Sequence, residues 1–176
     1  MVSLNVLFWF FVILFGVIGS MRGWAKEILV TFAVILALFF LTLLERFVPF
    51  IRDSLTGEPL FWLRTGILST LVFFGYQSPN IPRLAATNRF ARERLQDTLL
   101  GLFLGAANGF LFFGTIWFYL DEAKYPASII TAPVPGSPSA LAIEQLMSIL
   151  PPHWLGTPAI YFAVAIAFAF VLVVFI

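Results

Sequence analysis

The sequence predicts an all-α membrane protein: a polytopic bundle of about five transmembrane helices with one or two amphipathic helices at the membrane surface. Two observations support this fold class. Of the 176 residues, 61% are hydrophobic and 11% are charged, whereas soluble domains contain about 45–50% apolar and about 25% charged residues. The hydrophobic residues are also gathered into uncharged runs of spanning length, separated by segments that carry the prolines and most of the charges.

The first uncharged run covers residues 1–21, and a helix of that length reaches roughly 31 Å, enough to cross a hydrocarbon core. A cleaved signal peptide is the alternative, but no Lys or Arg precedes the run and no A-x-A site follows it. We predict that the first span is retained, and that four more spans lie at residues 28–44, 59–76, 98–120 and 158–176.

The connecting segments predict surface elements. Residues 45–58 interleave charged and apolar side chains, as a short segment at the membrane surface does. Residues 83–97 place an apolar stripe along a charged helix, which predicts an amphipathic interfacial helix running into the fourth span. The prolines of residues 121–157 predict a stiff loop. Within it, Ser137 followed by Pro138 predicts a helix start, and residues 141–150 a short helix that Pro151 and Pro152 stop. We therefore divide the chain into a four-helix membrane region (1–120), a Pro-rich extramembrane loop (121–156) and a fifth membrane helix (157–176).

Loop charges predict the orientation. The loops after spans one and three are richer in positive residues than those after spans two and four, so the positive-inside bias places the N-terminus outside. The first set is Arg22, Lys26, Arg83, Arg89, Arg92 and Arg94, and the second is Arg46, Arg52, Arg64 and Lys124.

Composition excludes several function classes. A net charge of +1 gives no basis for nucleic-acid binding, and the lack of cysteine excludes disulfides, iron–sulfur clusters and thiolate metal sites. The single histidine, His153, follows two prolines and is expected in a surface belt, with ligation of a pigment or metal as the alternative. No nucleotide-binding loop, metalloprotease motif or nucleophile elbow is present. We therefore expect no enzyme, no cofactor, no catalytic or metal site and no soluble small-molecule substrate.

Two glycine-rich stretches are more specific than composition. In the first span, Gly16 and Ser20, and likewise Gly19 and Gly23, are four residues apart. In the fourth span, Gly101, Gly105 and Gly109 repeat at the same interval and form one smooth groove. Small residues at this spacing allow close helix approach in lipid. Packing within the chain is one interpretation, and a docking groove for a partner helix or lipid-like ligand is the other.

The same stretches resemble the colicin V production protein (CvpA-like) family of bacterial inner-membrane proteins over roughly residues 1–120. An R-G-x-x-x-E signature ends the first span, here from Arg22 to Glu27, and a D-x-L-L-G-x-x-x-G-x-x-R-G pattern opens a later span, here from Asp97 to Gly109. Asn5 and Asn108 stand where the family often has Asp and Arg, so any ion pair of those charges is lost. The resemblance implies a multi-pass protein of the bacterial inner membrane, in a family loosely tied to colicin export and envelope maintenance.

Charge at membrane depth is the usual mark of an ion pathway. Arg22, Lys26 and Glu27 lie at a span end, where charge costs little, and we expect Arg22 and Glu27 to tie a tight turn. Because the spans lack a polar lining, we predict a structural, accessory or assembly subunit that packs against partner helices of a larger membrane complex, respiratory or photosynthetic in kind. A small channel, transporter or export and envelope-maintenance factor is the alternative.

Overall fold

The structure, a computed structural model, describes residues 4–77, 91–126, 134 and 136–175, and all regular elements in this part of the chain are helices. The predicted all-α class is therefore confirmed for it. The helices are α1 (Leu4–Arg22), α2 (Trp24–Phe47), α3 (Pro49–Ser54), α4 (Glu58–Tyr76), α6 (Ala91–Glu122), α7 (Pro138–Met147), α8 (Pro151–Trp154) and α9 (Ala159–Phe175).

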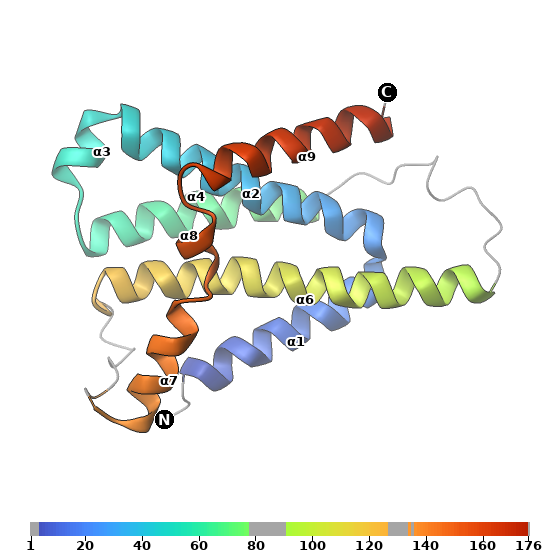
Figure 1. Cartoon of the computed structure of the whole chain (residues 1–176), viewed down its shortest axis with the longest axis horizontal. Helices are drawn as coiled ribbons and strands as arrows, with labels where there is room; N and C mark the ends of the chain where they lie inside the picture. The colour runs from blue at the N-terminus through green and yellow to red at the C-terminus, as the bar shows by residue number, and fades with distance from the viewer. Residues whose placement is uncertain (1–3, 78–90, 127–133, 135, 176) are drawn as a thin grey trace.

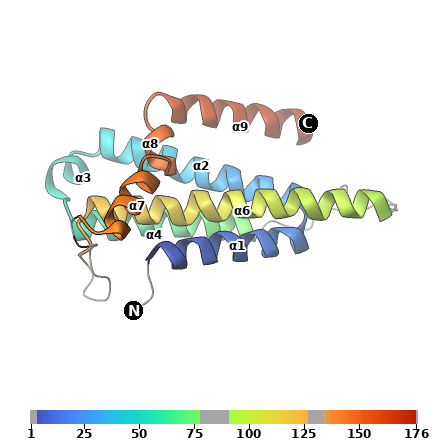
Figure 2. The ribbon, with the colours of Figure 1, turned by 60° about the horizontal axis from the view of Figure 1, so that its bottom comes forward.

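Four long helices form the bundle, and the most extensive contact is that between α1 and α6 (Figure 1). α2 packs against both α4 and α6, and α9 lies along the outer side of α2 (Figure 2). The turn between α1 and α2, the end of α4 and the start of α6 lie at one end of the bundle, called here the first end (Figure 1). α3, the start of α4 and the end of α6 lie at the second end.

Three helical segments of the described chain are long and apolar enough to cross a membrane: Leu4–Arg22, Trp24–Phe47 and Arg94–Glu122. A fourth crossing exists if Ala140–Trp154 and Ala159–Val173, bent by 58° at a short break, form one span. α4 is not among these segments, because Glu58, Arg64 and its small polar residues lower its hydropathy. The predicted number of about five spans therefore stays a prediction.

Several boundaries differ from the sequence-based ones. α2 begins at Trp24 and ends at Phe47 rather than covering only residues 28–44, because Glu27 and Glu45 are paired inside the bundle and need not lie beyond the helix. Residues 91–97 are the first turns of α6, a single 32-residue helix, so the expected run of the interfacial helix into the fourth span is confirmed for them. The rest of that predicted helix lies outside the described residues.

The Pro-rich segment contains two helices where one was expected. Ser137 caps α7, and its side chain accepts a hydrogen bond from the Ala140 backbone N–H, so the predicted start is confirmed. The prediction that Pro151 and Pro152 stop a helix reaching residue 150 is wrong, because α7 ends at Met147 and Pro151 begins α8. Proline at the first helical position needs no N–H partner, which favours starting a helix there.

The start of α8 is packed against α6, whereas His153 and Trp154 at its other end are exposed. Leu150 and Pro151 are fully buried, and a Cβ placed on Gly114 of α6 would lie 3.0 Å from Leu150 Cδ2 and 3.1 Å from Pro151 Cδ. Gly114 is therefore a notch that receives this segment. It lies eight residues before the end of α6 at Glu122, about 12 Å along the helix axis.

Candidate functional site

Glycines let the backbones of α1 and α6 touch. A Cβ built on Gly19 would overlap the Gly101 carbonyl oxygen, and one built on Gly105 would overlap the Phe15 carbonyl oxygen. Gly16 and Gly109 continue the contact: a Cβ on Gly16 would lie 3.3 Å from the Leu102 oxygen, and one on Gly109 would lie 2.8 Å from Phe15 Cβ. Both predicted glycine faces thus lie at one contact, where any larger side chain would push the helices apart.

A tight turn at Gly23 joins α1 to α2. Gly23 has a φ of +86° and a ψ of 158°, a region that is essentially open to glycine alone and costs any other residue roughly 1–3 kcal/mol. Asp97 of α6 lies against this turn, and its Oδ1 accepts a hydrogen bond of 3.2 Å from the Trp24 backbone N–H. A carboxylate at the start of α2 also interacts favourably with the helix dipole. Asp97 therefore fixes the first turn of α2 relative to α6.

A buried polar cluster lies one turn further along α2. Arg22 Nη1 donates to Glu27 Oε1 at 2.8 Å, and Asn108 Nδ2 donates to Glu27 Oε2 at 2.8 Å. Asn108 Oδ1 accepts from Thr31 Oγ1 at 2.7 Å. Arg22 Nη2 donates to the Tyr76 carbonyl oxygen at 3.0 Å, and its guanidinium lies 4.3 Å from the centre of the Tyr76 ring. The cluster therefore joins α1, α2, α4 and α6.

Glu27 lies in the first turn of α2 and pairs with Arg22 there, as expected, but its complete burial was not expected. Its side chain and that of Asn108 are 0% exposed, whereas the Arg22 side chain is 19% exposed. Asn108 lies near the middle of α6, far from either end of that helix. Although Asn108 carries no charge, its amide donates one of the two side-chain hydrogen bonds to the Glu27 carboxylate.

A second arginine network closes the other end of the bundle. Arg64 of α4 makes two hydrogen bonds to Glu45 of α2, Nε to Oε1 at 2.6 Å and Nη2 to Oε2 at 3.0 Å. Its Nη1 donates to Glu122 Oε2 at 2.5 Å, and the guanidinium lies 4.8 Å from the centre of the Tyr119 ring. Bidentate pairing with a carboxylate is the strongest geometry available to arginine. Arg64 therefore ties α2, α4 and α6 at the second end.

The remaining predicted residues lie outside these contacts. The Ser20 hydroxyl donates to the Val17 carbonyl oxygen of its own helix, at 2.7 Å. Asn5 is half-buried in the first turns of α1, and His153 is exposed in α8. In the described ranges, no group of three or more His, Cys, Asp or Glu residues is placed to hold a metal ion.

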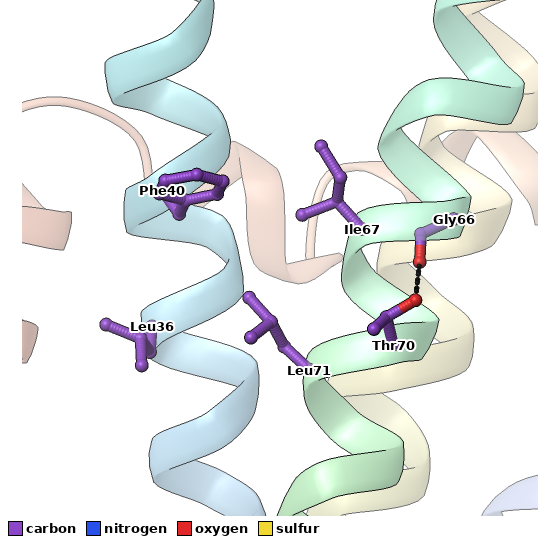
Figure 3. A pocket seen from close by; sticks show the side chains of 6 residues that line it. All are labelled: Leu36, Phe40, Gly66, Ile67, Thr70 and Leu71. Carbon is purple, nitrogen blue, oxygen red and sulfur yellow. Dashed lines mark hydrogen bonds between the residues drawn. The ribbon is translucent and has the colours of Figure 1, made fainter.

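An apolar groove opens on the outer surface between α2 and α4 (Figure 3). It has a volume of about 400 Å³ and is lined by two residues of α2 and four of α4. The Thr70 hydroxyl donates to the Gly66 carbonyl oxygen at 2.7 Å, so the groove wall offers no unsatisfied hydroxyl (Figure 3). The lining residues are Leu36, Phe40, Gly66, Ile67, Thr70 and Leu71.

Sequence reasoning missed three parts of this arrangement: the roles of Thr31 and Tyr76, the Arg64 network and the groove. The Arg64 side chain is only 11% exposed, because Glu45 and Glu122 bind it at the second end of the bundle. The available signal was that Glu45, Arg64 and Glu122 each lie near one end of a long helix. Antiparallel neighbours bring such ends together.

Neither a family model nor a curated protein or solved structure matches the chain. The resemblance to the colicin V production protein family therefore stays a prediction that rests on the two short motifs.

Proposed function

We propose that the chain is a non-catalytic, multi-pass membrane protein that serves as a structural or accessory subunit of a larger bacterial membrane complex, respiratory or photosynthetic in kind. Its α1–α2–α4–α6 core is the rigid part, and its outer helical faces are the parts that contact other subunits. About five spans cross the bilayer in this proposal, with α4 and α9 added to the three segments that qualify alone.

The outer face of α9 carries this proposal. α9 packs mainly on α2, and large apolar side chains such as Phe162, Ile166 and Phe168 are more than 60% exposed on it. Ala165 and Ala169, four residues apart, are exposed between them. Two small residues at this spacing let a second helix approach closely, and the flanking aromatic and aliphatic side chains add contact area. Such a face suits a helix–helix contact better than contact with lipid alone.

Charge supports the orientation with the N-terminus outside. Arg22 and Lys26 lie at the turn between α1 and α2, and Arg94 lies in the part of α6 that starts at the same end. The positive-inside bias favours this first end on the cytoplasmic side of a bacterial inner membrane.

Purification from native membranes in a mild detergent, followed by mass spectrometry, tests the accessory role. We expect other membrane subunits to co-purify in fixed ratio, and the variant Ala165→Leu/Ala169→Leu to lose them. Phe103→Leu, on the exposed face of α6, is the matched control and should retain them. A homogeneous protein that carries no other subunit would contradict the proposal.

A small channel or transporter is the second candidate, and one observation favours it. Glu27 and Asn108 are fully buried in the core, and ionisable groups at membrane depth are frequent in transport pathways. Reconstitution into liposomes distinguishes the two candidates. A solute or proton flux that Glu27→Gln abolishes would favour transport, whereas equal background leakage in both proteins would favour the accessory role.

A further inference from the structure

We infer that the buried cluster at the first end is a proton-linked latch. In its closed state Arg22 holds Glu27, and in its open state Arg22 has moved out to water and the Tyr76 hydroxyl takes its place on the Glu27 carboxyl group. The inference goes beyond the proposed function and does not rest on it, because the latch lies within one chain. It assigns to Tyr76 a positioning role that the closed arrangement does not use.

The closed state is the arrangement in the structure. The Glu27 side chain is 0% exposed, and Arg22 Nη1 lies 2.8 Å from its Oε1 as the cationic partner. Asn108 Nδ2 donates to the other carboxylate oxygen, also at 2.8 Å. A buried carboxylate is tolerated when a cation pairs with it, whereas a buried carboxylate without one is strongly unfavourable. The ionised form of Glu27 therefore depends on Arg22 staying in place.

Arg22 is the member of the cluster that is placed to move. It is the last residue of α1, and its side chain is 19% exposed, so water already reaches it in the closed state. Rotation about its side-chain bonds can carry the guanidinium further toward water while the stem stays along the helix. Its contacts with the carbonyl oxygen and the ring of Tyr76 are to uncharged groups. Neutralising Glu27 would therefore remove the ion pair from the contacts that hold Arg22.

Tyr76 supplies a second hydrogen-bond donor beside the same carboxylate. Its hydroxyl oxygen is buried and makes no hydrogen bond to a described residue. Glu27 and Arg22 both act electrostatically on this phenol, so it lies next to the ion pair. A buried hydroxyl without a partner costs free energy, which is recovered when a partner comes within reach. Once Arg22 has left Oε1 of Glu27, the Tyr76 hydroxyl can donate to that oxygen.

Opening the latch is coupled to proton uptake. After Arg22 has left, the donors that remain around Glu27 are uncharged, and a carboxyl group buried among neutral partners is stabilised by taking up a proton. The proton comes from water at the first end, and the O–H bond of the carboxyl group is the only bond made. Protonation and release of Arg22 therefore favour each other, as linked equilibria must. The charged and titratable groups on the helices around Glu27 at this end are Arg22, Lys26, Tyr76, Arg94 and Asp97.

Chemical labelling of arginine tests the release of Arg22. The purified protein is treated with phenylglyoxal, and the modification of each arginine is followed by mass spectrometry. We expect Glu27→Gln, which imitates the protonated side chain, to raise the labelling rate of Arg22 at least roughly tenfold, because a charge-assisted hydrogen bond no longer opposes release. Arg64, 11% exposed and paired with Glu45, is the internal control and should stay slow. An unchanged Arg22 rate, or an equal acceleration at Arg64, would overturn the latch.

Tyr76→Phe tests the alternative donor, because it removes only the hydroxyl. In the parent we expect no loss of thermal stability, since this hydroxyl has no partner among the described residues. In Arg22→Met, where the latch is open, the same change should lower the midpoint of thermal unfolding by about 2–4 °C, the effect of one lost hydrogen bond. Glu27→Gln provides a second open background if Arg22→Met does not fold.

Tyr119→Phe is the matched control for this comparison, because the Tyr119 ring also lies under a guanidinium, that of Arg64. Its effect on the unfolding midpoint should be the same in the parent and in the open backgrounds. Equal effects of Tyr76→Phe in the parent and the open backgrounds would show that the hydroxyl is not the alternative donor, and would overturn the inference.

Infrared spectroscopy tests the proton link. At neutral pH, Arg22→Met should show the absorption of a protonated carboxyl group, which the parent lacks and which adding Glu27→Gln removes. Arg22→Gln is the second variant if Arg22→Met does not fold. A spectrum without this band would overturn the link to a proton. None of these measurements depends on whether other subunits co-purify, so the latch and the accessory role can fail separately.

Discussion

Replacing Asn108 by leucine tests whether the buried cluster holds α6 against α2. The substitution removes two hydrogen bonds from Asn108 Nδ2 to Glu27, one to the carboxylate and one to the backbone oxygen, and the bond from Thr31. A hydrogen bond to a charged group contributes about 1.5–3 kcal/mol, and an unsatisfied buried group costs a further ~1–3 kcal/mol. We therefore expect the free energy of unfolding to fall by about 2.5–6 kcal/mol.

A double-mutant cycle separates this interaction from the change in side-chain shape. The four proteins are the parent, Asn108→Leu, Glu27→Leu and the double variant, with free energies of unfolding measured by steric trapping in bicelles. We expect a coupling of about 1.5–3 kcal/mol, because removing both partners leaves no orphaned carboxylate. This exceeds the average of about 0.6 kcal/mol for hydrogen bonds between membrane helices, since one partner is charged and fully buried. Additive effects within about 0.5 kcal/mol would refute the reasoning.

Substitutions at four other positions address the remaining contacts. Gly105→Leu should abolish folding, seen as loss of monodisperse protein in detergent, because its side chain would occupy the position of the Phe15 carbonyl; a normal yield would show that α1 and α6 do not touch there. Asp97→Ala should lower the free energy of unfolding by about 0.5–2 kcal/mol through loss of the cap on α2, and Asp97→Asn should retain most of it. Arg64→Gln should lower the free energy of unfolding by about 1–3 kcal/mol, because one amide cannot replace the hydrogen bonds to both carboxylates. Glu122→Gln should lower the free energy of unfolding by less, because the Glu122 side chain is 53% exposed and solvent screens its charge.

The long helices were predictable because their signal is local. Uncharged runs of spanning length indicate helices whatever their neighbours, and the helix boundaries at Pro59 and Ser137 follow from residues with known positional preferences. The pairing of the two glycine faces was also within reach, because both stretches carry small residues four apart. The register of the two glycine faces, meaning which glycine meets which, was not predictable. Gly19, for example, contacts both Gly101 and Gly105.

The Arg22–Glu27 pair, five positions apart, was predictable, but the polar contacts between residues far apart in the sequence were not. Glu27 and Asn108 are 81 positions apart, and no local pattern states which faces of α2 and α6 meet. The sequence placed Glu27 near a span boundary, where a glutamate ordinarily faces water. Only the close packing of α1 on α6 brings Asn108 over Glu27 and buries the Glu27 carboxylate. The insertion of Pro151 into the notch at Gly114 has the same cause, since it depends on a glycine in a different helix.

The two arginine networks explain how α4 can keep one face open. Apolar residues drive association weakly in lipid, so helix register in a membrane bundle depends on close packing and polar contacts. α4 takes part in both networks, through Tyr76 at the first end and Arg64 at the second, and each network reaches two or more other helices. A helix fixed at both ends does not need its middle to be covered in order to stay in place. The groove beside Gly66 can therefore remain open without loosening the position of α4.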